Sequence, residues 1–359
     1  MKRNLALIYG GKSGEHDVSV QTAYSIMQSI DYKTYNVHPV YITLEGLWLK
    51  RSTAFSAMPT SEDDFLDFDE YEIIENVFSF FSSIYVVFPV VHGPTGEDGS
   101  LQGFLELMDV PYVGSGVMGS AVGLDKAMMK TVFKQSDIPQ GPYLTFYKHD
   151  AILNVQEVIN NVQANLSFPV FVKPANLGSS IGISKAANSV ELIDALELAF
   201  TFDTKIVIEE MVDGRELEIG VLGHQNVKTS KIGEIITSKD FYDYEAKYEN
   251  QDVTQMIIPA NIPLGVKQRM SKIAKRAFKC LDCSGLARVD FFWNEQTNDL
   301  FVNEINTLPG FTQFSMYPAL FKEAGVPYQT LITKLIQFAL EKHEEKKQKH
   351  IISTDMVKE

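Results

Sequence analysis

Cysteines and long apolar runs are scarce in this chain of 359 residues. Its two cysteines, Cys280 and Cys283, have the C-x-x-C spacing of redox and zinc sites, but no second ligand pair accompanies them. They follow a segment whose apolar residues recur at helical spacing, so we interpret them as buried structural thiols. No apolar run reaches the ~18 residues of a membrane-spanning helix. The N-terminal apolar stretch is too short for a signal peptide and ends in a glycine turn, so we expect a cytoplasmic protein that does not bind membranes.

Positive charge is also in short supply. The chain has 32 Lys and Arg against 46 Asp and Glu, which gives a formal net charge of −14. This balance argues against a nucleic-acid-binding surface, so any phosphate group must be held by individual basic side chains and backbone N–H groups. The length allows two or three domains of roughly 100–200 residues each.

Neither common glycine-rich phosphate signature is complete. Gly10–Ser13 resembles the end of a P-loop, but Ala6 occupies the position of that motif's first glycine. The same segment lacks the G-x-G-x-x-G pattern of nicotinamide sites. The turn still joins an apolar strand to a helix near residues 18–30, where ligands of α/β domains bind. Glu15 would either bind a substrate ammonium there or act only as a helix cap.

Alternating apolar strands and helices predict a mixed α/β fold in three domains. Residues 1–122 should form an α/β domain with a parallel sheet, because one strand is almost entirely apolar. Within it, the acidic and aperiodic residues 51–75 are expected to be a surface insertion. We expect residues 123–215 and 216–359 to form two further domains.

Two predicted strands near the C-terminus carry polar residues at a spacing of two. Arg288 and Asp290 should lie on one face of the first strand, and Glu304 and Asn306 repeat the spacing on the next. Their oxygen donors suit Mg²⁺ bound with a nucleotide. The alternative is an edge hairpin with solvated acids. Alternation with apolar residues such as Phe291 favours a half-buried sheet.

Three other segments carry weaker signals. Lys173 ends an apolar strand, and the following turn holds Ser179 and Ser180, which could cover phosphate oxygens or belong to a simple hairpin. Glu216 follows another strand and would either bind ribose hydroxyls or remain a solvated acid. Residues 241–248 are rich in tyrosine, which is typical of a lid over a site or of an aromatic surface patch.

These segments together resemble the ATP-grasp ligases and, more narrowly, the D-alanine–D-alanine ligase family. The resemblance spans nearly the whole chain and depends on H-G-P-T-G-E-D-G, K-P-A-N-L-G-S-S-I-G-I-S-K, F-Y-D-Y-E-A-K-Y and N-E-I-N-T-L-P-G-F-T, in that order. It implies a three-domain ATP-grasp architecture. It also implies a reaction in which ATP activates one D-alanine as an acyl phosphate and a second D-alanine is joined to it, for peptidoglycan synthesis. The implied cofactors are ATP and two Mg²⁺ or Mn²⁺ ions, and the implied oligomeric state is a homodimer.

The resemblance assigns substrate contacts to particular residues. Glu15 would hold the ammonium of the first D-alanine, with His92 near its carboxylate. Ser315 and the Met316 amide would bind the carboxylate of the second D-alanine.

Nucleotide, metal and catalytic residues follow from the same resemblance. The ATP-binding residues would be Lys126, Lys173, Ser180, Glu209, Glu210, Val212 and Glu216. The metal ligands would be Asp290, Glu304 and Asn306. The oxyanion would be bound by Arg288 and the Gly310 amide. The lid would be closed by a triad of Glu15, Ser179 and Tyr248, with Lys247 reaching the γ-phosphate.

Two alternatives remain. A D-alanine–D-lactate or D-alanine–D-serine ligase would share most of these residues, but the depsipeptide type has a histidine in the lid. This chain has Tyr248 and no histidine between His224 and His343. A non-catalytic nucleotide-binding regulator would be expected to lose metal ligands or phosphate lysines, and none is missing.

Overall fold

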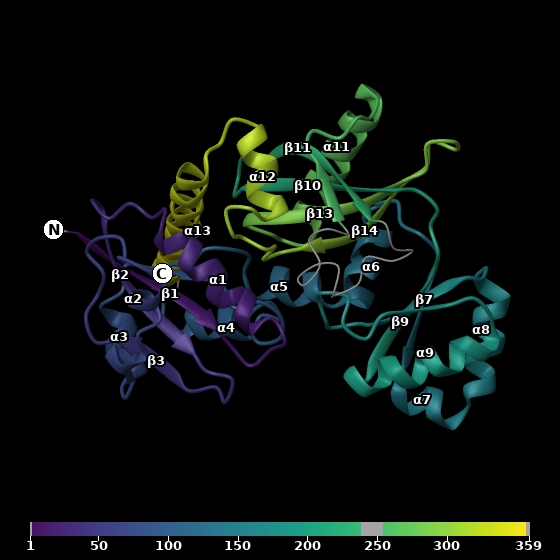
Figure 1. Ribbon diagram of the computed structural model, residues 1–359, viewed down its shortest axis with the longest axis horizontal. Helices are drawn as coiled ribbons and strands as arrows, with labels where there is room; N and C mark the ends of the chain where they lie inside the picture. Colours follow the sequence, from purple (N-terminus) through teal and green to yellow (C-terminus); the bar gives the residue numbers. More distant parts are fainter. Residues whose placement is uncertain (1, 238–253, 357–359) are drawn as a thin grey trace.

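The computed structural model describes residues 2–237 and 254–356, which form three sheets with helices around them (Figure 1). In the view of Figure 1 the first sheet lies at the left, the second at the lower right and the third above the space between them. The mixed α/β fold predicted from the sequence is therefore confirmed. Within the described residues, no helix combines the length and apolar character needed to cross a membrane.

The first sheet has the strand order β4-β3-β2-β1-β5. Its strands are β1 (Arg3–Gly10), β2 (Tyr35–Ile42), β3 (Trp48–Arg51), β4 (Tyr71–Ile73) and β5 (Val86–Pro89), and the helices beside them are α1 (His16–Met27), α2 (Glu62–Phe65), α3 (Val77–Ser82) and α4 (Ser100–Leu107), with a 3₁₀ turn at Phe68–Glu70. Strand β1 runs parallel to β2 and β5. Alternate residues of β1 enter two hydrophobic clusters, Leu5 and Leu7 one and Ala6 and Ile8 the other, which explains its unbroken apolar sequence.

The acidic segment 51–75 differs from the surface insertion that we expected. It contributes β4, which pairs with β3 and extends the first sheet by antiparallel strands. Phe65 from this segment is fully buried, with its ring 5.1 Å from that of Tyr9. The segment thus supplies part of the core as well as an acidic surface.

The second sheet, ordered β6-β9-β7-β8, is antiparallel. Its strands are β6 (Tyr143–Tyr147), β7 (Val170–Pro174), β8 (Ser184–Ala186) and β9 (Lys205–Glu210), accompanied by α7 (Lys148–Leu153), α8 (Val155–Asn165) and α9 (Ser189–Phe202). Two helices, α5 (Val117–Leu124) and α6 (Lys126–Gln135), lead into it from the first sheet. Asp125 caps α6 by accepting hydrogen bonds from the backbone of Ala127 and Met128.

The third sheet, ordered β12-β11-β10-β13-β14, is also antiparallel. Its strands are β10 (Arg215–Gly223), β11 (Lys228–Thr237), β12 (Thr254–Ile257), β13 (Gly285–Trp293) and β14 (Leu300–Asn306), and its helices are α11 (Leu264–Cys280) and α12 (Met316–Glu323). Cys283 is buried in this core, and burial raises the pKa of its thiol to about 12. Cys280 is only partly buried, so the buried-thiol interpretation fits Cys283 better.

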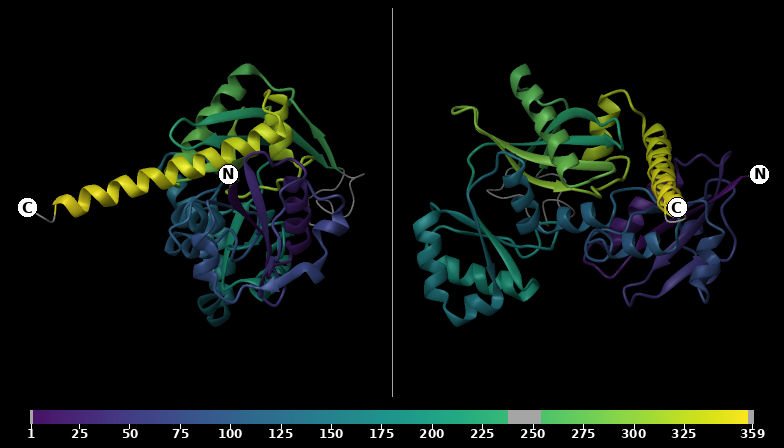
Figure 2. Two further views of the ribbon diagram at one scale, coloured as in Figure 1. Left: turned by 90° about the vertical axis from the view of Figure 1, so that its left-hand side faces the viewer. Right: turned by 180° about the vertical axis from the view of Figure 1, so that it is seen from behind.

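The last helix, α13 (Tyr328–Met356), joins the first and third sheets. Its apolar residues, among them Leu331 and Leu335, enter the same hydrophobic cluster as Leu5 of β1 and Leu286 of β13. Figure 2 shows its C-terminal end extending beyond the rest of the molecule. This packing joins the first and third sheets through one hydrophobic cluster.

Candidate active site

A cavity of about 500 Å³ lies between the second and third sheets, a volume typical of small-molecule sites. It is lined from both sheets and from the turn after β7. Many of the predicted residues line it: Lys126, Lys173, Ser179, Ser180, Glu209, Glu210, Val212, Glu216, Arg288, Asp290 and Glu304. The predicted residues outside its lining are Glu15, His92, Asn306, Gly310, Ser315 and Met316.

On one wall, Arg288 forms a bidentate pair with Asp290. Arg288 Nε and Nη2 donate to the two carboxylate oxygens at 2.8 and 2.7 Å, and Nε also lies 3.0 Å from Glu218 Oε2. Burial alone would lower the pKa of Arg288, but the charges of Asp290 and Glu218 raise it well above its usual value. The guanidinium therefore stays charged in the wall of the cavity.

The neighbouring strand adds two of the predicted ligands. Register in the β13–β14 hairpin sets Asp290 opposite Glu304 and Arg288 opposite Asn306. Asn306 Nδ2 donates to Asp290 Oδ2 at 3.0 Å. Asp290, Glu304 and Asn306 are of the oxygen-donor types that suit Mg²⁺ or Mn²⁺. Both Asp290 oxygens accept hydrogen bonds from Arg288, and no group of three His, Cys, Asp or Glu side chains in the described residues is arranged to hold a metal ion.

Sequence reasoning missed Glu218. It is 2 % exposed and pairs with Asp290 across β10 and β13. The two-residue spacing from Glu216 could have identified Glu218 from the sequence, because it places both acids on one face of β10.

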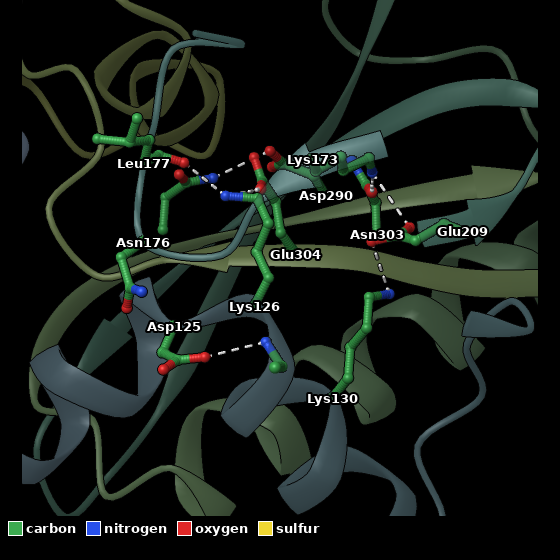
Figure 3. A network of polar contacts seen from close by, with 12 residues as sticks. Asp125, Lys126, Lys130, Lys173, Asn176, Leu177, Glu209, Asp290, Asn303 and Glu304 are labelled. Carbon is green, nitrogen blue, oxygen red and sulfur yellow. Dashed lines mark hydrogen bonds and ion pairs between the residues drawn. The ribbon is translucent and has the colours of Figure 1, made fainter. Parts of the chain in front are cut away.

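On the opposite wall, lysines surround a buried carboxylate (Figure 3). Lys173 Nζ donates to Glu209 Oε2 at 3.1 Å and to Asn303 Oδ1 at 3.3 Å. Lys130 Nζ lies 3.4 Å from the other oxygen of Glu209. Lys130 and Asn303 were also missed from the sequence, although Lys130 stands four residues after Lys126 on α6 and so shares its face.

Lys126 is held between the two walls. Its Nζ donates to the Leu177 carbonyl at 2.6 Å and lies 3.9 Å from Glu304 Oε2. One ammonium group thereby links the turn after β7 to Glu304 of the β13–β14 hairpin.

Beyond the cavity, the turn after β7 meets the start of α1. Ser179 Oγ donates a hydrogen bond to Glu15 Oε1, which brings two members of the predicted triad into contact. Ser179 adopts a positive φ of 50°, a strained conformation for a residue with a side chain. The third member, Tyr248, and the neighbouring Lys247 lie outside the described residues.

His92 is buried and Glu97 is half-buried near Glu15. Burial lowers the pKa of His92, although the charge of Glu15 opposes this. Burial and then the charge of Glu15 raise the pKa of Glu97 to about 8, although Glu97 accepts a hydrogen bond of 2.8 Å from the Gly93 amide. Glu97 was missed as a separate residue, but it belongs to the H-G-P-T-G-E-D-G segment.

Ser315 and Met316 lie at the start of α12, and Gly310 lies in the loop before it, beside the Ser315 side chain. Ser315 is the N-cap residue, and its Oγ accepts a hydrogen bond of 3.1 Å from the Thr312 amide. Met316, the first helical residue, is buried beside Ile235. The positive end of the helix dipole here suits a carboxylate ligand.

Comparisons with known proteins match this chain to D-alanine–D-alanine ligases over nearly its whole length. Two family models, described as "D-ala D-ala ligase N-terminus" and "D-ala D-ala ligase C-terminus", match residues 4–115 and 132–337. The chain is 47% identical over 357 residues to the D-alanine--D-alanine ligase of Bacillus pumilus, covering 96% of this chain and 98% of the relative. It is 41% identical over 374 residues to that of Ruminiclostridium cellulolyticum, covering 99% and 100%.

Solved structures give the same relationship. The D-alanine-D-alanine ligase from Coxiella burnetii superposes with a TM-score of 0.85 at 33% identity, covering 99% of each chain. The VanG D-Ala:D-Ser ligase from Enterococcus faecalis gives a TM-score of 0.83 at 31% identity, covering 94% of this chain and all of the other.

Proposed function

This chain belongs to the D-alanine–D-alanine ligase family, and on that premise we propose how its residues join two D-alanines with ATP. The fold is that of the ATP-grasp ligases, and the function is ATP-dependent formation of D-alanyl-D-alanine for peptidoglycan. The arrangement of the cavity walls is the main support for these residue roles. The cavity has basic residues suited to phosphates on one wall and the Arg288–Asp290–Glu304 cluster on the other, and the Ser179–Glu15 contact lies beside it.

The reaction needs an activated carboxylate, because joining two amino acids in water is uphill. A carboxylate oxygen of the first D-alanine attacks the γ-phosphorus of ATP, which forms an acyl phosphate and releases ADP. The amine of the second D-alanine attacks the acyl carbon, and phosphate leaves with that oxygen. Both steps concentrate negative charge on oxygen, so catalysis depends on positioning and on fixed positive groups.

Each group of residues has a place in this scheme. Lys126 and Lys173, with the Ser180 hydroxyl, bind ATP phosphates, and Glu15 accepts the ammonium of the first D-alanine with His92 nearby. Arg288 and the Gly310 amide face the oxyanion. The adenine and ribose contacts are proposed for Glu209, Glu210, Val212 and Glu216, and the second carboxylate for Ser315 and Met316. Lys247 and Tyr248 keep the lid roles predicted from the sequence.

Two divalent cations, Mg²⁺ or Mn²⁺, are proposed to be held by Asp290, Glu304 and Asn306. Their chemistry would be to neutralise the phosphate oxygens of bound ATP. The protein itself contributes Arg288, whose charge is shared among Asp290, Glu218 and the reacting oxygen.

Glu97 influences the charge that the first substrate meets. With its pKa raised to about 8, the carboxyl is mostly protonated at neutral pH. Glu15 then supplies the negative charge that faces the substrate ammonium, and the buried pair avoids two adjacent carboxylates.

The nearest alternative is a ligase that accepts D-serine or D-lactate as the second substrate, since VanG shares the fold. The discriminating experiment measures phosphate release and identifies products with D-alanine alone and with added D-serine or D-lactate, over a range of pH. We expect D-alanyl-D-alanine to dominate in every mixture near neutral pH. A mixed product formed faster than the dipeptide would favour the alternative.

Domain boundaries at 1–122, 123–215 and 216–359, a homodimeric state and a cytoplasmic location remain proposals. The presence of one sheet in each range supports the boundaries, with α13 packing back on the first sheet. Light scattering on the purified protein tests the homodimer, with a molar mass twice that of the 40.3 kDa chain expected.

A further inference from the structure

We propose that Lys130 acts as a counter-charge of Glu209 and thereby keeps Lys173 able to bind the phosphates of the nucleotide. Lys130 is a positioning residue in this proposal, because it acts through Glu209 and Lys173. The inference rests on the proposed role of the cavity in binding ATP, and it assigns a function to a residue outside the set predicted from the sequence.

The geometry divides one carboxylate between two ammonium groups. Glu209 Oε1 lies 3.4 Å from Lys130 Nζ, and Oε2 accepts a hydrogen bond of 3.1 Å from Lys173 Nζ. In Figure 3 the Glu209 carboxylate lies between the two side chains, which approach it from α6 and β7. All three residues line the 500 Å³ cavity, so a change at one of them alters the wall that a nucleotide meets.

Lys130 is unusual for a lysine because its side chain is almost completely buried, with 1 % of the residue exposed. The ring of Tyr143 is another neighbour, with its centroid 5.3 Å from Nζ. Burial lowers the pKa of Lys130, and the charge of Glu209 opposes that shift. A buried ammonium persists only with a carboxylate beside it, so Lys130 and Glu209 depend on each other.

The same reasoning applies to Glu209. Burial would raise the pKa of its carboxyl, but Lys130 and Lys173 together hold the pKa below its usual value. The carboxylate is therefore ionised and attracts both lysines. When the Lys173 ammonium turns toward a phosphate, Lys130 alone balances Glu209.

Removal of Lys130 would change that balance. Among the residues that the structure describes, Glu209 would then be left with Lys173 as its close cation, and the two would pair more tightly. A phosphate group would have to compete with a buried carboxylate for the Lys173 ammonium. The expected consequence is weaker binding of ATP, with little effect on a ligand that has no phosphate.

The experiment compares the dissociation constants of ATP and adenosine by calorimetry on the full chain. For Lys130→Met we expect the ATP constant to rise about tenfold or more while the adenosine constant changes by less than about threefold. The double variant Lys130→Met/Glu209→Gln removes the carboxylate that captures Lys173. It should restore the ratio of the two constants to within about threefold of the parent value.

Two further variants separate this role from simple structural support. Lys134→Met changes an exposed lysine one turn along α6 and should leave both constants unchanged. Lys130→Arg keeps the charge and should retain most of the ATP affinity. Loss of affinity for both ligands in parallel, or an unchanged ATP constant in folded Lys130→Met, would overturn the proposal.

The test remains decisive if Lys130→Met does not fold. The double variant removes both charges of the buried pair and is expected to fold. If its ATP-to-adenosine ratio is still shifted about tenfold, Lys130 acts on the nucleotide directly and the inference is wrong. Dipeptide synthesis by the parent protein is measured separately. A parent that binds ATP but makes no dipeptide contradicts the proposed function and leaves the binding comparison intact.

Discussion

Replacement of Arg288 by alanine should affect catalysis and stability by different routes. Arg288 lines the cavity on the wall opposite Lys173 and is the proposed donor to the reacting oxygen. Loss of one preorganised oxyanion donor costs ~2.7–4 kcal/mol of barrier, so kcat should fall about 100- to 1000-fold. Binding of ATP should change much less, because Lys126 and Lys173 remain in place to bind its phosphates.

The stability effect follows from the two acids that Arg288 neutralises. Asp290 and Glu218 are 3 % and 2 % exposed, so the alanine variant leaves two buried carboxylates without their guanidinium. Breaking a buried ion pair in this way costs about 3–5 kcal/mol, a large share of the roughly 5–15 kcal/mol that stabilises a typical domain.

Removing one of the two buried carboxylates tests this reasoning directly. Adding Glu218→Gln should recover part of the stability without recovering kcat.

The assay combines phosphate release at saturating substrates, ATP calorimetry and thermal unfolding at several pH values. Arg269→Ala is the matched control, since Arg269 is exposed on α11 and donates to the Asn298 carbonyl. A kcat within about threefold of the parent would remove Arg288 from the oxyanion role. A melting curve as stable as the parent's at pH 8 would refute the electrostatic reasoning.

Three other predictions follow from the same contacts. Glu304→Gln should abolish the activation by Mg²⁺ or Mn²⁺ while thermal unfolding stays close to the parent's, and a metal titration of activity that matches the parent's would contradict this. Glu97→Gln should flatten the pH dependence of stability between pH 4.5 and 8, because folded Glu97 keeps a proton until about pH 8 and the unfolded chain loses it near 4.5; identical unfolding profiles would refute it. Cys283, whose thiol pKa is raised to about 12, should resist alkylation in the folded protein at pH 8, and mass spectrometry showing rapid labelling would exclude its burial.

Local patterns predicted the parts of the site that lie within one strand or one turn. The two-residue spacings of Arg288 with Asp290 and of Glu304 with Asn306 place each pair on one face of a strand, and the hairpin register then brings them together. The glycine–serine turn after Lys173 was found in the same way. These features depend on neighbours in sequence, which a single chain displays directly.

The missed residues depend on contacts between distant segments. Glu218 reaches Asp290 because β10 pairs with β13, some seventy residues later along the chain. Lys130 meets Glu209 because α6 packs near β9. The spacings from Glu216 and from Lys126 place these residues on a face of their element, but no local spacing identifies the partner on the distant segment.

Packing between distant segments explains both why residues 51–75 differed from expectation and where α13 docks. Residues 51–75 lack periodicity, yet Phe65 packs against Tyr9 and Tyr24, and this fixes a segment whose own pattern predicted only an acidic surface. The N-terminal part of α13 has buried apolar residues at helical spacing, among them Leu331 and Leu335. Its docking on β1 and β5 is set by the shape of the first sheet, which the sequence of the helix does not encode.

The central claim is that a D-alanine carboxylate becomes an acyl phosphate before the peptide bond forms. The most direct test supplies D-alanine labelled with ¹⁸O in its carboxylate, together with ATP and Mg²⁺, and follows the label by mass spectrometry. We predict D-alanyl-D-alanine, ADP and phosphate in equal amounts, with one ¹⁸O from the carboxylate in each phosphate released. Dipeptide formation with unlabelled phosphate, or ATP consumption without dipeptide, would contradict the account.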